Sequence, residues 1–196
     1  MTKIKICGVR TVGDARAVAA AGADFIGVVL SPSPRRAALS ELEAIVAAIG
    51  AQVSSVGVFS SVDNLTSFDR TCDVTLDYYQ VYFDYAGVSV RQPKRGWIRS
   101  FMMTNADGVP TDDSSELLLY DFKNVGVPAS ADKISVPERI TRTKIFIAGD
   151  LRPDNVATIV KAYRPFGVDA ARGTEKSPGV KDMSKVEQFV RSVRNA

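Results

Sequence analysis

The sequence predicts an α/β protein of the (β/α)8, or TIM-barrel, class, formed as a single domain by residues 1–196. Three observations support this prediction. Short apolar runs typical of buried strands alternate with segments of helical periodicity, which is the order of a parallel sheet with connecting helices. Eight such runs follow one another along the chain. A length of 196 residues suits one domain at the small end of the barrel size range, and no stretch of linker composition divides it.

The first two strand–helix units show the pattern most clearly. Lys3–Cys7 is expected to be a strand, and residues 12–21 are expected to form a helix that ends before a glycine. The second strand is expected at residues 25–30. Ser40 and Glu43 have the spacing of a capping box, which predicts that the second helix starts there and runs to residue 49.

The later elements are less regular. Residues 84–96 contain two glycines and a proline and are expected to form a loop or a degenerate helix. Residues 122–143 leave room for a short helix at most, and Pro153 is expected in the first turn of the helix after the seventh strand. The remaining strands are expected at residues 54–59, 79–83, 97–103, 117–121, 144–148 and 167–170, and the remaining helices at residues 64–71, 153–162 and 183–194.

Several polar side chains fall where predicted strands end. In a barrel of this class the carboxyl ends of the strands face one mouth, where active sites lie. Cys7, Asp121, the pair Gly149 and Asp150, and residues 169–173 are therefore expected to converge there. A thiol and a carboxyl are suitable groups for acid–base chemistry. Taken from its strand alone, however, Cys7 is equally compatible with a buried and inert thiol.

The loops after the seventh and eighth strands are candidates for an anion site. Loops in these positions commonly hold a phosphate through backbone N–H groups, and glycine allows close approach. Gly149 and Gly173 suit this role, and Arg172 supplies positive charge. Asp150 does not suit it, because its negative charge would repel a phosphate. An ordinary turn is the alternative interpretation of each glycine.

Composition narrows the function classes. The net charge is +3, but Lys and Arg are scattered without interleaved aromatic residues, so a small anion is a better partner than nucleic acid. With no histidine and two cysteines, neither a disulfide framework nor a transition-metal site is expected. The start of the chain has no signal-like apolar region, and the apolar runs are too short to cross a membrane, so we expect a cytoplasmic protein without membrane attachment.

Several short motifs occur in an order that spans nearly the whole chain. Together they resemble the phosphoribosylanthranilate isomerases of tryptophan biosynthesis. The Lys-Ile-Cys-Gly motif and the Arg-Pro-Phe-Gly-Val-Asp motif, each at its expected place, form the most specific pair. The matching segments are residues 5–8, 22–24, 33–35, 56–59, Asp121, Gly149, 151–156 and 164–169.

The resemblance implies a cofactor-free Amadori rearrangement, in which an aminoaldose phosphate becomes an aminoketose. By position, Asp121 is the general acid that opens the furanose ring, and Cys7 is the general base that removes a proton from the carbon next to the imine. Arg35 is implied to bind the anthranilate carboxylate, with Arg36 as the nearby competitor. Asp169 is implied to help fix the substrate, although a structural carboxylate is a close alternative.

The sequence also departs from the family pattern. The fourth strand has Tyr82-Phe83 where the family has His-Gly, and the last two loops carry Asp150 and Arg172 where the family has glycine and serine. One alternative is therefore a barrel that binds a sugar phosphate with little or no catalysis. Another is a related sugar isomerase of histidine synthesis, or one that serves both pathways, although that family presents aspartate where this chain has Cys7. For the oligomeric state, the sequence is compatible with a monomer and with a homodimer.

Overall fold

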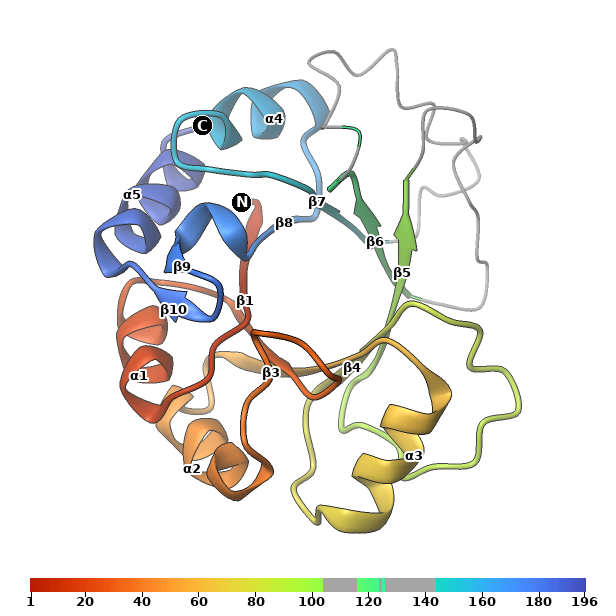
Figure 1. The fold of residues 1–196 in the computed structure, drawn as a ribbon. Helices are drawn as coiled ribbons and strands as arrows, with labels where there is room; N and C mark the ends of the chain where they lie inside the picture. The colour runs from red at the N-terminus through yellow and green to blue at the C-terminus, as the bar shows by residue number, and fades with distance from the viewer. Residues whose placement is uncertain (104–115, 124, 126–143) are drawn as a thin grey trace.

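The computed structural model describes residues 1–103, 116–123, 125 and 144–196, and these form the predicted barrel (Figure 1). Eight parallel strands are hydrogen-bonded in chain order, and the eighth pairs with the first to close the sheet. The predicted fold class is confirmed. The strands are β1 (Lys3–Cys7), β2 (Phe25–Val29), β3 (Ser54–Phe59), β4 (Tyr78–Val81), β5 (Gly96–Met102), β6 (Leu117–Asp121), β7 (Lys144–Ala148) and β8 (Gly167–Ala170).

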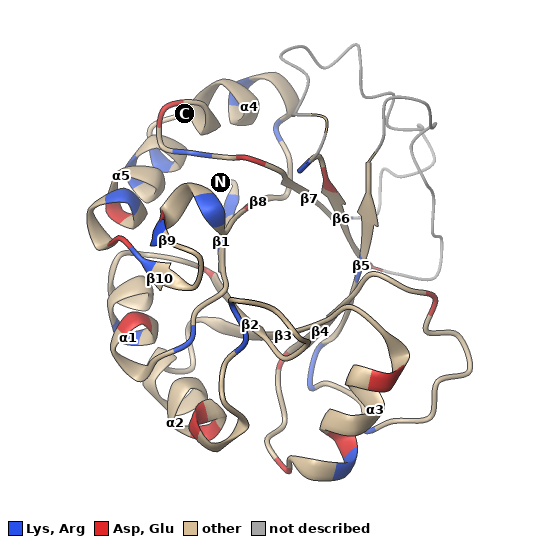
Figure 2. Cartoon of the chain, viewed as in Figure 1, with Lys and Arg blue, Asp and Glu red and all other residues tan. Residues whose placement is uncertain are grey.

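Helices surround the barrel on the outside (Figure 1). Acidic and basic residues share the same helices, as α3 and α5 show in Figure 2. The α-helices within the described residues are α1 (Val12–Ala20), α2 (Leu39–Ile49), α3 (Val62–Thr71), α4 (Val156–Tyr163) and α5 (Met183–Arg194). A short 3-10 helix, η3 (Arg172–Thr174), and a small hairpin of β9 (Glu175–Ser177) and β10 (Val180–Lys181) follow β8. None of the described helices is long and apolar enough to span a membrane.

Side-chain packing divides between the two faces of the sheet. In β6, for example, Leu118 and Tyr120 contact the helical layer, whereas Leu117 and Leu119 face the barrel interior. Aromatic rings fill the interior, with Phe146 lying edge-on to the ring of Phe25 at 5.2 Å between centroids. The interior is therefore a second core rather than a channel.

The predicted capping box of the second helix is wrong. α2 begins at Leu39, one residue before Ser40, and its N-cap is Ala38, which makes no side-chain capping bond. The Ala37 N–H donates to the Val29 carbonyl at 3.0 Å, so the chain stays attached to β2 until that point. The helix starts directly afterwards, and Ser40 falls inside its first turn, where its hydroxyl does not cap the helix.

The predicted place of Pro153 in the first turn of a helix is also wrong. α4 begins at Val156, and Asn155 is its N-cap. The Asn155 side chain accepts a hydrogen bond from the Arg152 N–H at 2.8 Å and donates one to the Asp150 carbonyl at 3.0 Å. These two bonds stabilise a separate turn ahead of the helix, and Pro153 lies in that turn.

Other boundaries differ by one or two residues. α3 starts at Val62 rather than at residue 64 because Ser61 accepts a hydrogen bond from the Asn64 N–H and caps the helix. β4 ends at Val81, two residues earlier than expected. Residues 84–95 form a loop, as one of the two predictions had it, and Gly96 already begins β5. Most of the segment 122–143 lies outside the described residues, so its prediction is not tested.

Candidate active site

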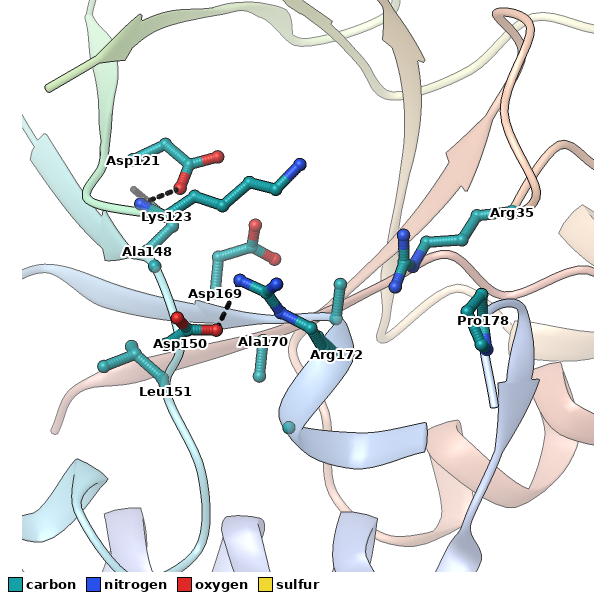
Figure 3. Close-up of a pocket in the computed structure, with 13 residues that line it drawn as sticks. Arg35, Asp121, Lys123, Ala148, Asp150, Leu151, Asp169, Ala170, Arg172 and Pro178 are labelled. Carbon is teal, nitrogen blue, oxygen red and sulfur yellow. Dashed lines mark hydrogen bonds and ion pairs between the residues drawn. The ribbon is translucent and has the colours of Figure 1, made fainter. Parts of the chain in front are cut away.

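A cavity of about 390 Å³ lies at the mouth formed by the carboxyl ends of the strands (Figure 3). Its walls come mainly from the ends of β6, β7 and β8 and from the loops that follow them. Almost every site residue that the sequence predicted lines this cavity, and Cys7 is the exception. The predicted residues that line it are Arg35, Asp121, Gly149, Asp150, Asp169, Arg172 and Gly173.

Asp121 is the last residue of β6, and its carboxyl group is held at both oxygens. Oδ1 accepts a hydrogen bond from the Lys123 backbone N–H at 3.0 Å, and Oδ2 accepts one from the Tyr82 hydroxyl at 3.4 Å. Burial raises the pKa of Asp121, and the negative charge of Asp169 raises it further, whereas the two hydrogen bonds act in the opposite direction. The net pKa lies above the ordinary aspartate value, which favours a protonated acid.

Tyr82 belongs to the site although the sequence analysis did not select it. Its hydroxyl accepts a hydrogen bond from Gln80 Nε2 at 3.2 Å and donates to Asp121. Burial raises the pKa of Tyr82 well above its ordinary value, so the hydroxyl keeps its proton. The signal was available, because residues two apart on a strand share one face and Gln80 precedes Tyr82 by two. In the sequence, Tyr82 stands out only as a departure from the histidine of the family pattern.

Cys7 ends β1 and is 8% exposed, below the cavity wall rather than on it. Its Sγ lies beside Gly27, where an added Cβ would be 2.8 Å from the sulfur and 3.0 Å from Lys5 Nζ. Burial raises the pKa of the Cys7 thiol, and so does the charge of Asp169, while the ammonium groups of Lys5 and Lys181 lower it. The net pKa is above the ordinary value.

Lys5 is the second residue that the sequence analysis missed. Its side chain is fully buried, and Nζ donates to Asp169 Oδ1 at 3.0 Å. Burial lowers the pKa of Lys5, but the neighbouring Asp169 and Cys7 more than reverse this, so the net pKa is raised. The signal was a charged residue placed between two isoleucines, Ile4 and Ile6, in a strand expected to be buried.

Arg35 reaches the cavity, but a carboxylate of this chain already holds its guanidinium. Nε donates to Glu175 Oε1 at 2.9 Å, and Nη2 donates to Glu175 Oε2 at 2.8 Å. These hydrogen bonds raise the pKa of Arg35. Glu175 also forms a buried ion pair with Lys181 at 3.3 Å, and burial lowers the pKa of Lys181. The three charges form one network that joins the loop after β2 to the hairpin after β8.

The loops after β7 and β8 contact each other directly. Gly149 has φ +111°, and a Cβ there would lie 2.5 Å from the Phe122 carbonyl carbon. A Cβ at Gly173 would lie 2.0 Å from the Leu151 carbonyl oxygen. Both glycines are therefore required for backbone contact in the loops. Arg172 Nη2 and Asp150 Oδ1 form an ion pair at 2.5 Å between the two loops (Figure 3).

In the part of the chain that the structure describes, no group of three or more Cys, Asp or Glu side chains is arranged to hold a metal ion. The described site contains several carboxyl groups, a thiol, a phenol and several cations.

The comparisons with known proteins agree with one another. The family model for N-(5'-phosphoribosyl)anthranilate (PRA) isomerase matches residues 4–192. The chain belongs to the PRA isomerase family. An N-(5'-phosphoribosyl)anthranilate isomerase of Pseudomonas aeruginosa is 34% identical to this isomerase over 202 residues, which cover 98% of this chain and 95% of the relative.

Solved structures show the same fold. TrpF from Jonesia denitrificans has a TM-score of 0.81 and 26% identity, covering 100% of this isomerase and 98% of that chain. A PRA isomerase in complex with reduced 1-(o-carboxyphenylamino)-1-deoxyribulose 5-phosphate has a TM-score of 0.77 with complete coverage of both chains, and at 22% identity it supports the fold alone. The family predicted from the sequence is thus confirmed.

Proposed function

We propose that Asp121 and Cys7 are the acid and the base of the reaction that this chain catalyses, the isomerisation of phosphoribosyl anthranilate in tryptophan biosynthesis. This reaction is an Amadori rearrangement, in which one group gives a proton to the ribose ring oxygen and another takes a proton from the carbon next to the imine. The observation that carries the assignment is the buried carboxyl of Asp121 on the cavity wall, at the same end of the barrel as the Cys7 thiol.

The proton transfers balance with these two groups. Protonated Asp121 gives its proton to the ring oxygen, the bond from that oxygen to the anomeric carbon breaks, and the nitrogen lone pair forms a protonated imine. The Cys7 thiolate then takes the proton from the adjacent carbon, and the released electron pair gives an enolamine. The enolamine tautomerises to the ketone. Asp121 regains a proton from solvent and Cys7 releases one, so the cycle consumes none.

The raised pKa values of Asp121 and Cys7 predict how the activity depends on pH. The reactive form needs Asp121 protonated and Cys7 ionised, and the pKa values of both groups are raised. The ordinary pKa of a carboxyl lies well below that of a thiol, and we propose the same order for Asp121 and Cys7. Between the two pKa values this form is a minor one whose fraction does not change with pH. We therefore expect a flat optimum for kcat/KM, with an acidic limb at the pKa of Asp121 and an alkaline limb at the pKa of Cys7.

The substrate phosphate is proposed to bind the loops after β7 and β8. Arg172 supplies the positive charge, Gly173 lets the loop after β8 approach the Leu151 backbone of the loop after β7, and Gly149 lets that loop approach the backbone of Phe122 and Lys123. The Asp150 carboxylate forms an ion pair with the Arg172 guanidinium, so the phosphate competes with a carboxylate of the protein for this group. The 5-phosphate of the analogue bound to a structural relative supports a sugar phosphate as ligand.

The anthranilate carboxylate is proposed to bind Arg35. Among the described residues, the Arg35 guanidinium bonds Glu175 through Nε and Nη2, which leaves the Nη1 hydrogens for a ligand. Glu175 then fixes the guanidinium plane, and its charge is shared with Lys181. Asp169 lines the same cavity and is proposed to accept a hydrogen bond from a sugar hydroxyl through the oxygen that faces away from Lys5.

The test follows the loss of phosphoribosyl anthranilate fluorescence. We expect Cys7→Ser and Asp121→Asn each to lower kcat by about 10²- to 10⁴-fold, because each removes one proton-transfer group. Matched controls are Cys72→Ser, which changes the other buried cysteine, and Asp73→Asn on an exposed aspartate, and both should keep full turnover. Wild-type rates in either active-site variant would refute the corresponding role.

The remaining proposals concern the location of the protein in the cell and its oligomeric state. We propose a cytoplasmic location, where a biosynthetic sugar phosphate is made and used, and fractionation of the source cells tests it. A monomer or a homodimer fits the described site equally, because the residues proposed to act all come from one chain. Size-exclusion chromatography with light scattering separates the two states.

A further inference from the structure

Lys5 is unusual because a lysine side chain is fully buried inside the barrel. Burying an ammonium group is costly unless a counter-charge and hydrogen bonds compensate. Asp169 forms an ion pair with Lys5, at 3.0 Å from Nζ to Oδ1. This ion pair joins β1 to β8, whose residues Lys5 and Asp169 are directly paired in the sheet register. The proposed substrate contacts do not use Lys5, and it does not line the cavity.

The thiol of Cys7 lies on the same face of β1, two residues further on. In the sheet register Cys7 pairs with Gly27 of β2. An added Cβ at Gly27 would lie 2.8 Å from Cys7 Sγ and 3.0 Å from Lys5 Nζ, so the sulfur and the ammonium both lie close to this one glycine. Only a glycine at position 27 leaves room for both groups. The ammonium, the carboxylate and the sulfur thus form one buried cluster.

We propose that Lys5 is a positioning residue of this isomerase, and that its buried ammonium, anchored by Asp169, orients the Cys7 sulfur and stabilises it as the thiolate. This inference rests on the proposed role of Cys7 as the base. Lys5 acts through Cys7 and contacts no reacting atom, because it lies beneath the cavity wall.

The charges around Cys7 favour this role for Lys5 over other cations. Lys181 and Arg35 also act on the thiol, but both are already paired with Glu175. Asp169 opposes Lys5, and the Tyr82 hydroxyl stays neutral. The largest charge effect on Cys7 comes from Lys5, and it lowers the pKa of Cys7 against the effect of burial. Removing Lys5 therefore depletes the thiolate that the reaction needs.

The test measures the thiol directly and then the activity. The chain has two cysteines, so labelling with [3-13C]cysteine gives two signals, and Cys72→Ser leaves that of Cys7 alone. In this background we expect Lys5→Met to raise the pKa of Cys7 by about one unit or more, seen as a displaced 13Cβ titration. The flat optimum of kcat/KM should then fall by about tenfold or more, and the alkaline limb should move up by about one pH unit or more.

The matched control is Lys3→Met, the same substitution two residues away on the same strand, at a half-exposed lysine paired with Asp24. It should move neither the titration nor the limb. Lys5→Met/Asp169→Asn leaves no unpaired buried charge and replaces the single variant if that one does not fold. In the double variant we expect a smaller upward shift, because Lys5 acts on Cys7 more strongly than Asp169 does.

The outcomes separate this inference from the proposed function. An unshifted Cys7 titration in a folded Lys5 variant overturns the role of Lys5, even if Cys7→Ser is inactive. A shifted titration together with an active Cys7→Ser variant overturns the proposed base instead. A fall in activity with no change in the titration or in the alkaline limb indicates a merely structural lysine and also rejects the inference.

Discussion

At the amino end of β1, Lys3 forms an ion pair with Asp24 at 2.8 Å, and two residues further on Lys5 forms one with Asp169 at 3.0 Å. Asp24 also accepts hydrogen bonds from Arg194 Nη2 at 2.8 Å and from the Ile4 N–H at 2.9 Å. Burial alone would raise the pKa of Asp24, but its hydrogen bonds to Lys3 and Arg194 outweigh it and lower the pKa. The charge of Asp24 is therefore compensated by three donors, namely Lys3, Arg194 and the Ile4 N–H.

At the carboxyl end of the barrel, acidic and basic residues also lie close together, but there the pKa of an aspartate is raised rather than lowered. Asp121 lies near the charge of Asp169, and the pKa of Asp121 is raised by burial and by this charge. The thiol of Cys7 is also kept from ionising easily by burial. The amino end thus uses its ionic groups for stability, whereas the carboxyl end holds a carboxyl and a thiol above their ordinary pKa values, which suits the proton transfers proposed for them.

The largest effect that tests this comparison is expected at the amino end. Asp24→Asn removes a charge that three donors share, so we expect the free energy of unfolding to fall by about 1–3 kcal/mol, measured by urea denaturation at pH 7. Turnover at 25 °C should stay at the wild-type rate. A large loss of kcat without loss of stability would contradict the division between the two ends.

The same variant has a pH signature with a defined sign. Because the folded pKa of Asp24 is lowered, its contribution to stability is present above the unfolded value of 3.8 and is lost as the pH falls through the lower folded pKa. The difference in stability between wild type and Asp24→Asn should therefore be constant near neutral pH and should vanish at the acid end. A difference that grows on acidification would contradict the assignment.

A smaller effect is expected where the loops after β7 and β8 meet. Asp150 has φ +51°, a conformation that asparagine tolerates, so Asp150→Asn removes the charge and keeps the backbone. Arg172 is then free for the substrate phosphate, and we expect KM to fall by about two- to fivefold with kcat unchanged.

Arg172→Gln supplies the opposite control for that prediction, because it removes the cation and should raise KM. Inhibition by inorganic phosphate gives an independent reading, and Asp150→Asn should strengthen it. If Asp150→Asn leaves both KM and phosphate inhibition unchanged, Asp150 does not compete for Arg172.

The smallest effect is expected at Tyr82. Its hydroxyl donates to the ionised form of Asp121, so Tyr82→Phe should raise the pKa of that carboxyl by about half a unit. The acidic limb of kcat/KM should move to higher pH by the same amount. Tyr78→Phe is the control, because that tyrosine lies on β4, the strand directly ahead of Tyr82 in the chain, but lines a different pocket, with Trp97 and Glu116. A limb that stays in place or moves down would show that Tyr82 does not act on Asp121.

The sequence predicted the strands better than the helix starts. Buried parallel strands are continuous apolar runs, so each strand was found within two residues of its observed bounds. Helix starts depend on contacts with distant segments. α2 begins where Ala37 leaves its hydrogen bond to Val29, and α4 begins after a turn held by Asn155. A local capping pattern such as that of Ser40 and Glu43 carries no information about such contacts.

The site was predicted in its positions but not in its pairings. Asp121 and Arg35 lie in the cavity as expected from strand ends and motifs. The partner of Arg35 is Glu175, which is 140 residues away along the chain, and Asp169 lies 164 residues from Lys5. Cys7 lies beneath the cavity rather than on its wall, because β1 ends within the buried interior.

By itself, the sequence determined the alternation of strands and helices, the family, and the carboxyl and thiol that end β6 and β1. These follow from periodicity and from residue types at fixed places in short motifs, which are local properties of the chain. Only the tertiary structure decided which charges meet, including Lys5 with Asp169, Arg35 with Glu175, and Tyr82 with Asp121. Those contacts form when the barrel closes and β8 pairs with β1, and their strength depends on a burial that no local pattern specifies.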